Sequence, residues 1–312
     1  MGVSSPFLPD GEAFGGGFMR EFIAAGVQLA PVPGDVGANI EKALKALPKA
    51  IEVGAELVVF PETATTGFDT GLSKEELWDL VDFVPGKATE RIQEAAAKYR
   101  IYIVWPTYER GKDRGVVYNS AILIGRNGDI VGTYRKTHPF PGELVEFGGW
   151  TTPGDRADVF ETDLCTLGMI ICYDGDFPDL STTLALKGAE VIVRPSALLR
   201  TYDHWWATSF ARAYDNHVYV VAVNAVGGDG GGNYYFGHSM IIAPNGWKLA
   251  QGRCAEEVVY ATLKEDALKY VYGGMTTLQS FDHLEDRNLK VYDVMKPGKS
   301  RFEPGRHVRG GA

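Results

Sequence analysis

Short apolar runs alternate with amphipathic segments along the chain, which is the pattern of strands and helices in an α/β protein. In the first half, this pattern predicts strands over 22–30, 56–60 and 101–105 and helices over 39–53, 73–83 and 88–99. Ser73 and Glu76 have the spacing of a capping box, so the second of these helices is expected to begin after Ser73. Pro48 conflicts with the first helix and is expected to kink it.

A predicted hairpin interrupts this alternation near the middle of the chain. The apolar runs 116–124 and 129–134 flank an Asn127-Gly128 turn, which favours antiparallel pairing. In the second half, predicted strands and helices alternate again, with strands over 167–172, 190–193 and 218–223 and helices over 178–186 and 204–214. Two such sets predict an α/β fold with two mixed sheets packed together and helices outside, a four-layer α-β-β-α sandwich.

Composition places this fold in one large domain. The chain has 312 residues, 45% hydrophobic and 23% charged, which is typical of a soluble globular protein. Residues 1–20 include three consecutive glycines and read as an N-terminal tail. We expect the domain to cover 21–270, and the polar segment 271–312 to form a C-terminal arm at a subunit interface.

Charge and cysteine usage narrow the functional classes. A net charge of -9 leaves no basic surface for nucleic acid, and no apolar run reaches the roughly 18 residues of a membrane span. The first 20 residues lack the pattern of a secretory signal, so we expect a cytoplasmic protein. The three cysteines cannot all pair, and neither they nor the histidines have metal-ligand spacing, so no metal site is expected.

Three residues that could carry chemistry stand at the ends of predicted strands. Glu62 follows the run 57–61, Lys136 follows the second hairpin strand, and Cys172 ends the strand 167–172 before a turn and a helix. Taken alone, Glu62 and Lys136 are more often solvated surface residues, and a buried cysteine is often a small core residue. The strand-to-helix bend at Cys172, however, resembles a nucleophile elbow with free backbone N–H groups beside it.

Together the three side chains suit acyl transfer. A thiol needs a base to become a thiolate, and a neighbouring lysine would stabilise that thiolate. A lysine and a backbone N–H can hold the oxyanion of a tetrahedral intermediate, and a protonated glutamate can release an amine.

The residues around these three positions resemble the nitrilase, or carbon-nitrogen hydrolase, superfamily with its Glu-Lys-Cys triad. The similarity covers about residues 22–265 and is strongest for the aliphatic amidase and formamidase branch. The matching stretches are Phe60-Pro61-Glu62, Tyr134 to His138, Gly168 to Asp174 with Phe177-Pro178, Leu186 to Val193, and Gly237-His238-Ser239.

The resemblance also implies roles for further residues. A second glutamate that orients the lysine is expected downstream; Glu143 and Glu146 are both candidates, and the spacing to the Trp150–Gly154 turn favours Glu146. The backbone N–H of Tyr173 would help to hold the oxyanion. Thr63, Phe140 and Leu198 fall where that branch lines its acyl pocket.

The function implied is an amidase that hydrolyses a primary carboxamide through a thioester on Cys172, without a cofactor. An N-carbamoyl amine or amino acid amidohydrolase, and a nitrilase, remain alternatives because they use the same triad. A non-catalytic, ammonia-channelling module is a further alternative, against which the complete triad argues.

The expected partners are a small-molecule amide and further copies of this chain. The predicted helix 204–214 carries four large aromatic side chains, more than one buried stripe accommodates. Together with the resemblance, this predicts a homo-oligomer built on a dimer.

Overall fold

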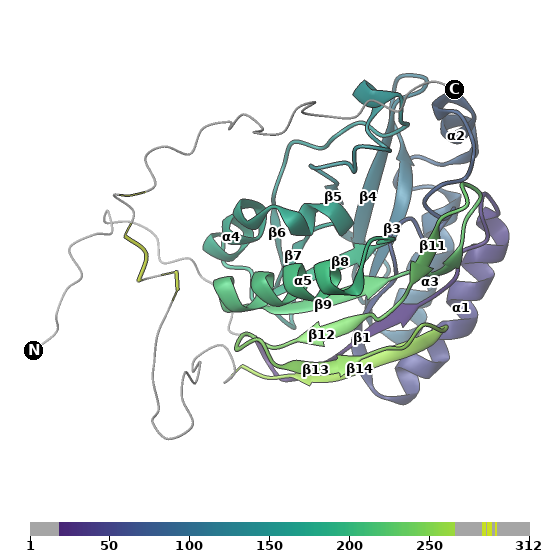
Figure 1. Ribbon diagram of the computed structural model, residues 1–312. Coiled ribbons are helices and arrows are strands. Elements are labelled where there is room, and N and C mark those ends of the chain that lie inside the picture. The colour runs from purple at the N-terminus through teal and green to yellow at the C-terminus, as the bar shows by residue number, and fades with distance from the viewer. Residues whose placement is uncertain (1–18, 266–282, 285, 289–290, 292–312) are drawn as a thin grey trace, which may run out of the picture.

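The computed structural model describes residues 19–265, 283–284, 286–288 and 291, and these form layered sheets with helices outside (Figure 1). The expected tail over 1–20 and arm over 271–312 lie almost entirely outside the described residues. Their predicted roles, including the subunit interface of the arm, stay predictions.

The first sheet contains six strands in a mixed arrangement. They are β1 (Phe22–Gln28), β2 (Ala55–Val59), β3 (Tyr102–Arg110), β4 (Val117–Ile124), β5 (Ile130–Arg135) and β14 (Glu257–Leu263). Their order is β14-β1-β2-β3-β4-β5. β1, β2 and β3 are parallel, and β4 is antiparallel to both β3 and β5. Because of the predicted hairpin, β5 runs in the same direction as β2, so the carboxyl ends of both strands lie on the same side of the sheet.

The second sheet has six strands as well, in the order β13-β12-β9-β8-β7-β6. Its strands are β6 (Val159–Glu161), β7 (Thr166–Met169), β8 (Val191–Ser196), β9 (Tyr219–Asn224), β12 (Met240–Ile242) and β13 (Lys248–Gln251). β7, β8 and β9 are parallel. A short ribbon of β10 (Val226–Gly228) and β11 (Tyr234–Phe236) stands beside the sheets.

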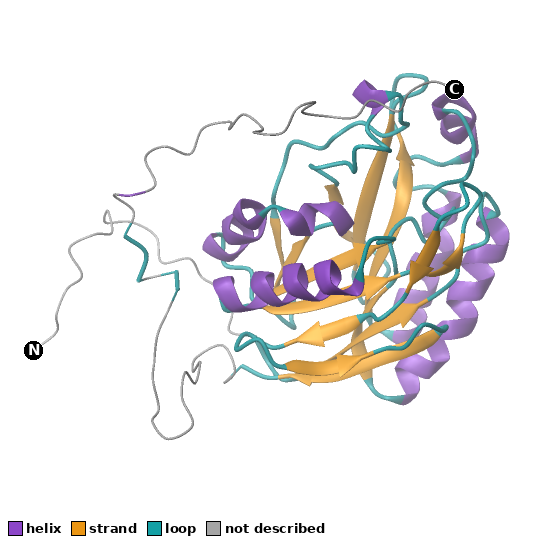
Figure 2. Ribbon diagram, in the orientation of Figure 1, coloured by secondary structure: helices purple, strands orange, loops and turns teal. Residues whose placement is uncertain are grey.

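Helices cover the outer faces of both sheets (Figure 2). α1 (Val36–Glu52) and α3 (Lys87–Tyr99) pack on the first sheet, and α4 (Pro178–Leu186) and α5 (Tyr202–Asn216) on the second. The short α2 (Lys74–Leu80) begins with the predicted capping box of Ser73 and Glu76. The four-layer α-β-β-α architecture with two mixed sheets is confirmed.

The alternation of side chains along β1 shows how the layers divide the core. Ala24 packs into the cluster between the two sheets, whereas Ala25 packs into the cluster beneath α1 and α3. Gly26 follows, and a Cβ there would stand 2.7 Å from Cγ2 of Val223 on β9. The glycine thus allows the sheets to approach closely at this point.

α1 continues through Pro48, which is exposed to solvent, as a helix over 39–53 requires, and the kink stays a prediction. Two other local predictions differ from the structure. α2 ends at Leu80, before the predicted end at residue 83. β7 ends at Met169, and Cys172 begins a separate 3-10 turn, η2 (Cys172–Asp176), because the chain already bends toward α4 there.

Candidate active site

Glu62 lies just beyond the carboxyl end of β2 and is fully buried. Three donors hold its carboxylate: Lys136 Nζ and Asn119 Nδ2 each lie 2.7 Å from Oε1, and the backbone N–H of Ala197 lies 2.7 Å from Oε2. Asn119 is on β4, and Ala197 follows β8 in the other sheet. The glutamate is therefore fixed from both sheets, which rules out the solvated surface residue that its sequence position alone suggested.

Lys136 lies between two buried carboxylates. Its Nζ is 2.7 Å from Glu62 Oε1 and 2.8 Å from Glu143 Oε1, and none of the three side chains is exposed. Burial lowers the pKa of Lys136, but the charges of Glu143 and Glu62 outweigh it and hold that pKa above its ordinary value. Burial also raises the pKa of the Glu143 carboxyl, although Lys136 opposes the change. The ammonium is thus held in its charged form.

The structure corrects the choice of second glutamate: Glu143, not Glu146, contacts Lys136. The loop folds back so that the Glu143 carbonyl accepts hydrogen bonds from the N–H groups of Trp150 and Thr151, at 2.8 and 2.7 Å. A 3-10 turn, η1 (Val145–Phe147), then directs Glu146 to the exposed surface. Spacing along the chain could not identify Glu143, because the loop folds back and places Glu143, the earlier of the two glutamates, next to Trp150 and Thr151.

Cys172 begins η2 with a φ of 48°, in the left-handed region that non-glycine residues rarely adopt. This strained bend after β7 matches the elbow that the sequence suggested. Burial raises the pKa of the thiol, the charge of Glu62 raises it further, and Lys136 lowers it. The expected stabilisation of the thiolate by lysine is therefore outweighed, and the resting cysteine is a neutral thiol that needs a base.

Asp174 ties the lysine loop to the cysteine elbow. It is fully buried, its Oδ2 accepts the N–H of Ile171 at 2.8 Å and the hydroxyl of Tyr134 at 2.7 Å, and its Oδ1 accepts the N–H of His138 at 2.9 Å. By accepting the Ile171 N–H, the Asp174 carboxylate caps the turn at Cys172 from the buried side. His138 stacks on Phe177 with ring centroids 3.9 Å apart.

A narrow, mainly apolar pocket opens beside Cys172. Two of the predicted acyl-pocket residues, Phe140 and Leu198, line it, as does Tyr173, whose ring meets that of Phe140 edge-on at 5.4 Å. Thr63 is buried directly after Glu62, but it does not line this pocket. The full lining is Phe68, Phe140, Cys172, Tyr173, Ala197, Leu198, Leu199 and Arg200, around a free volume of about 20 Å³.

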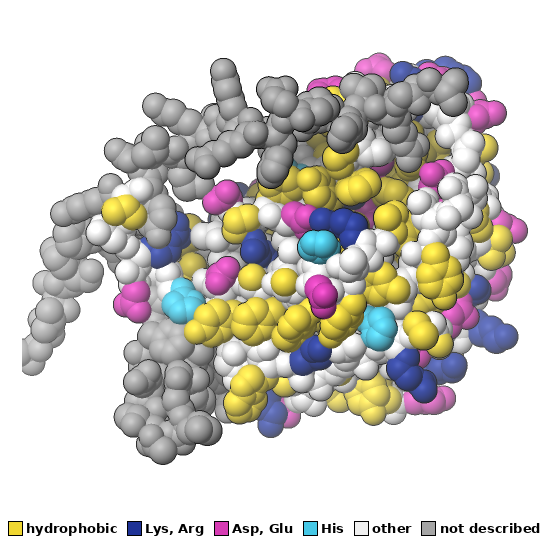
Figure 3. All heavy atoms as spheres, viewed as in Figure 1, with side chains coloured by type: hydrophobic (Ala, Val, Ile, Leu, Met, Phe, Trp, Pro, Cys, Tyr) yellow, Lys and Arg dark blue, Asp and Glu magenta, His cyan; other side chains and the backbone are white. Residues whose placement is uncertain are grey.

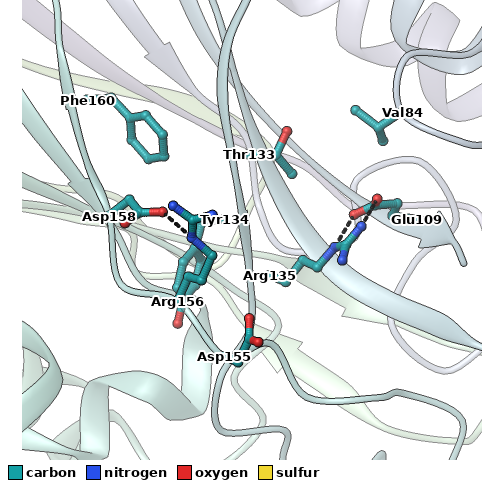
Figure 4. A pocket seen from close by; sticks show the side chains of 9 residues that line it. All are labelled: Val84, Glu109, Thr133, Tyr134, Arg135, Asp155, Arg156, Asp158 and Phe160. Atoms are coloured by element: carbon teal, nitrogen blue, oxygen red, sulfur yellow. Dashed lines mark hydrogen bonds and ion pairs between the residues drawn. The ribbon is translucent and has the colours of Figure 1, made fainter.

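A larger cavity, of about 440 Å³, lies elsewhere along β5 (Figure 4). Figure 4 shows two ion pairs in it, Arg135 with Glu109 and Arg156 with Asp158. None of Glu62, Lys136, Glu143 and Cys172 lines it. Despite its size, this cavity is lined by no cysteine, so the chemistry is assigned to the smaller pocket.

Sequence reasoning missed Asn119 and Arg194, which contact Glu62 and the Cys172 carbonyl respectively. Asn119 follows a tyrosine in an ordinary strand pattern, and Arg194 is the one charged residue in the apolar strand β8. A charge inside a buried strand was the signal that could have identified Arg194.

Metal and membrane features are not seen in the described part of the chain. There, no group of three or more His, Cys, Asp or Glu side chains is placed to hold a metal ion. No helix among the described residues is both long and apolar enough to span a membrane.

Comparison with known proteins agrees with this geometry. The carbon-nitrogen hydrolase family model matches residues 23–270. The chain is 32% identical to Omega-amidase NIT2 of Danio rerio, over 78% of this chain and 89% of that protein. It is 36% identical to a nitrilase of Pyrococcus abyssi, over 75% and 86%.

Solved structures show the same fold. A carbon-nitrogen hydrolase from Helicobacter pylori superimposes with a TM-score of 0.79 at 25% identity, covering 89% of this chain and 99% of that one. The chain therefore belongs to the carbon-nitrogen hydrolase family of the nitrilase superfamily, and it is a hydrolase that acts on carbon–nitrogen bonds other than peptide bonds.

Proposed function

We propose that this protein is an amidase that hydrolyses small primary carboxamides to a carboxylic acid and ammonia. The observation that carries the proposal is the buried cluster of Glu62, Lys136 and Glu143 at the neutral thiol of Cys172. Such a cluster supplies a base, a fixed positive charge and a nucleophile, and its charged side chains are buried.

The first half of the reaction forms a thioester. Cys172 Sγ attacks the amide carbonyl carbon while Glu62 takes the thiol proton. The oxyanion is held by the Lys136 ammonium and the backbone N–H of Tyr173. When the intermediate collapses, the protonated Glu62 gives its proton to the departing nitrogen, and ammonia leaves.

The second half restores the enzyme. Glu62 takes a proton from water, the resulting hydroxide adds to the thioester carbonyl, and the same two donors hold the new oxyanion. Collapse expels the thiolate, which regains the proton from Glu62, and the carboxylic acid is released. Glu143 takes no proton in this scheme; it orients Lys136 and balances its charge.

The pocket supports a small, uncharged acyl group. The pocket is small, with a volume of about 20 Å³, and five of its eight lining residues are Phe, Ala or Leu. A bulky acyl chain would require these side chains to move.

A second candidate is an amide or carbamoyl compound that carries a carboxylate, which Arg200 at the pocket could bind. The guanidinium of Arg200, however, already makes a bidentate ion pair with Asp176, at 2.7 and 2.9 Å. Because this pairing neutralises Arg200, we favour the uncharged amide. Omega-amidase NIT2 is named among the relatives, so the carboxylate-bearing amide belongs in the test.

The test is ammonia release from four matched compounds: propionamide, succinamic acid, N-carbamoylglycine and propionitrile. We expect propionamide to be the best substrate and the Cys172→Ala variant to be inactive on it. Cys254→Ala is the matched control, because Cys254 is exposed and lies outside the site. Carbon dioxide release from N-carbamoylglycine at a higher kcat/KM than propionamide hydrolysis, or full activity of Cys172→Ala, would overturn the proposal.

A further inference from the structure

Arg194 is a fully buried arginine directly behind the cysteine elbow. It lies on β8 among apolar neighbours, and none of its surface is exposed. Burial lowers its pKa to about 10, so the guanidinium still carries its charge at neutral pH. A buried charge is costly unless it is paired and its N–H groups are hydrogen-bonded, so the partners of Arg194 need to be identified.

Two of the four hydrogen bonds that its guanidinium donates are directed at a single atom. Nε and Nη2 both donate to the carbonyl oxygen of Cys172, at 2.9 and 2.7 Å. On the opposite side, Nη1 donates to Thr208 Oγ1 at 2.8 Å and to Ser209 Oγ at 2.9 Å, so α5 fixes the guanidinium from behind. The planar fork is thus held rigidly, and it clamps one backbone carbonyl.

The chain leaves room for this clamp at Gly175. A Cβ at that position would stand 2.1 Å from Cζ of Arg194, so the guanidinium packs directly against the backbone of η2. The ring of Trp205 lies on another side, 4.9 Å from Cζ. The backbone of η2 and the guanidinium of Arg194 therefore pack closely against each other.

The carbonyl that Arg194 holds belongs to the same peptide unit as the N–H of Tyr173. In a planar trans peptide the C=O and N–H point in opposite directions, so fixing one fixes the other. A charged donor on the carbonyl also polarises the peptide and makes its N–H a stronger donor. In the proposed reaction this N–H holds the oxyanion, and the inference rests on that function.

We propose that Arg194 is a positioning residue for the oxyanion-binding peptide: by clamping the Cys172 carbonyl it orients and polarises the Tyr173 N–H. The arginine touches neither substrate nor leaving group. Its effect is felt only when negative charge develops on the substrate oxygen, which makes it a contribution to kcat and not to ground-state binding.

The experiment compares two reactions of the same cysteine. Amide hydrolysis passes through an oxyanion, whereas alkylation of the thiol by iodoacetamide does not. Both are measured in a Cys254→Ala background, so that the exposed thiol does not react. In Arg194→Lys, which keeps the charge but loses the fork, we expect kcat for the amide to fall about 10-fold to 100-fold. KM and the alkylation rate of Cys172 should stay within about threefold.

The matched control is Arg126→Lys, which alters an arginine that bridges Glu56 and Asp163 away from the site. It should leave both reactions unchanged. If Arg194→Lys does not fold, as judged by thermal unfolding, the double variant Thr208→Val/Ser209→Ala loosens the guanidinium from behind. It should show the same pattern with a smaller fall in kcat.

Two results would overturn the proposal. If Arg194→Lys is folded and its kcat is within twofold of wild type, the hydrogen bonds from Arg194 to the Cys172 carbonyl do not contribute to turnover. A parallel fall in amide turnover and alkylation would show that Arg194 acts through the thiol instead. Failure of the proposed function would be seen separately. In that case the unmodified protein would be inactive on every amide, or Cys172→Ala would be active.

Discussion

Asn119 connects Glu62 with Lys136. Its side-chain Nδ2 donates to Glu62 Oε1 at 2.7 Å, and its backbone carbonyl accepts the N–H of Lys136 at 2.8 Å. One residue of β4 thus sets the distance between the carboxylate that follows β2 and the lysine that follows β5. The antiparallel pairing of β4 and β5 is what makes this possible.

Replacing Asn119 by alanine should lower kcat about 10-fold to 100-fold, because a hydrogen bond to a charged group is worth roughly 1.5–3 kcal/mol. The glutamate would lose one of the three donors that fix its orientation. Steady-state amide hydrolysis is the measurement. Ser120→Ala is the matched control, since the neighbouring Ser120 donates to Glu109 and not to Glu62. Equal activity of the two variants would contradict the role of Asn119.

The two candidate glutamates should separate clearly on mutation. Glu143→Gln removes the negative charge 2.8 Å from Lys136 Nζ and should reduce kcat about 100-fold, because the ammonium loses a buried partner. Glu146→Gln alters an exposed side chain and should leave kcat within about twofold. The measurement is kcat of both purified variants, with thermal unfolding to check that each is folded. A larger loss of kcat in Glu146→Gln than in Glu143→Gln would show that Glu146 is the second glutamate.

Cys172 should make folding stability depend on pH in the alkaline range. Burial raises the pKa of its thiol in the folded state, so above the unfolded pKa of about 8.5 the unfolded chain loses a proton that the folded chain keeps. The unfolded state binds fewer protons there, and stability therefore falls as pH rises. Relative to Cys172→Ala, the native protein should lose about 1 kcal/mol between pH 9 and 10. Urea unfolding of both at pH 7.5, 9 and 10 measures this, and a constant difference would refute it.

The aromatic residues of α5 differ in burial. Trp205 is buried, whereas Trp206, Phe210 and Tyr214 are half-buried and follow one another along the helix, with ring centroids 5.3 and 5.7 Å apart. Figure 3 shows a row of hydrophobic side chains on this face. The apolar row supports the prediction of a homo-oligomer built on a dimer.

Light scattering at micromolar concentration should give at least twice the chain mass of 34.0 kDa. Phe210→Glu should lower it toward one chain, because a charge on the row is costly to bury. Phe83→Glu is the control, since Phe83 is exposed and lies outside α5. A single-chain mass for the unmodified protein would contradict the dimer.

The layers could be predicted from the sequence, and so could three candidate residues of the site. The periods of hydrophobic residues specify strands and helices, since only one face of each element is buried, and the turn at Asn127-Gly128 specifies the hairpin that makes the first sheet mixed. Glu62, Lys136 and Cys172 could be proposed because each stands at the end of a predicted strand and because the stretches around them resemble the nitrilase superfamily.

Only the tertiary structure decided which groups surround them. Glu143 replaced Glu146 because the loop doubles back on Trp150 and Thr151, and fold-back depends on contacts that spacing does not encode. Arg194 meets Cys172 across 22 positions of sequence, through two neighbouring strands of the second sheet. The protonation of the thiol was decided in the same way, because burial and the nearby charge of Glu62 exist only once the sheets have packed.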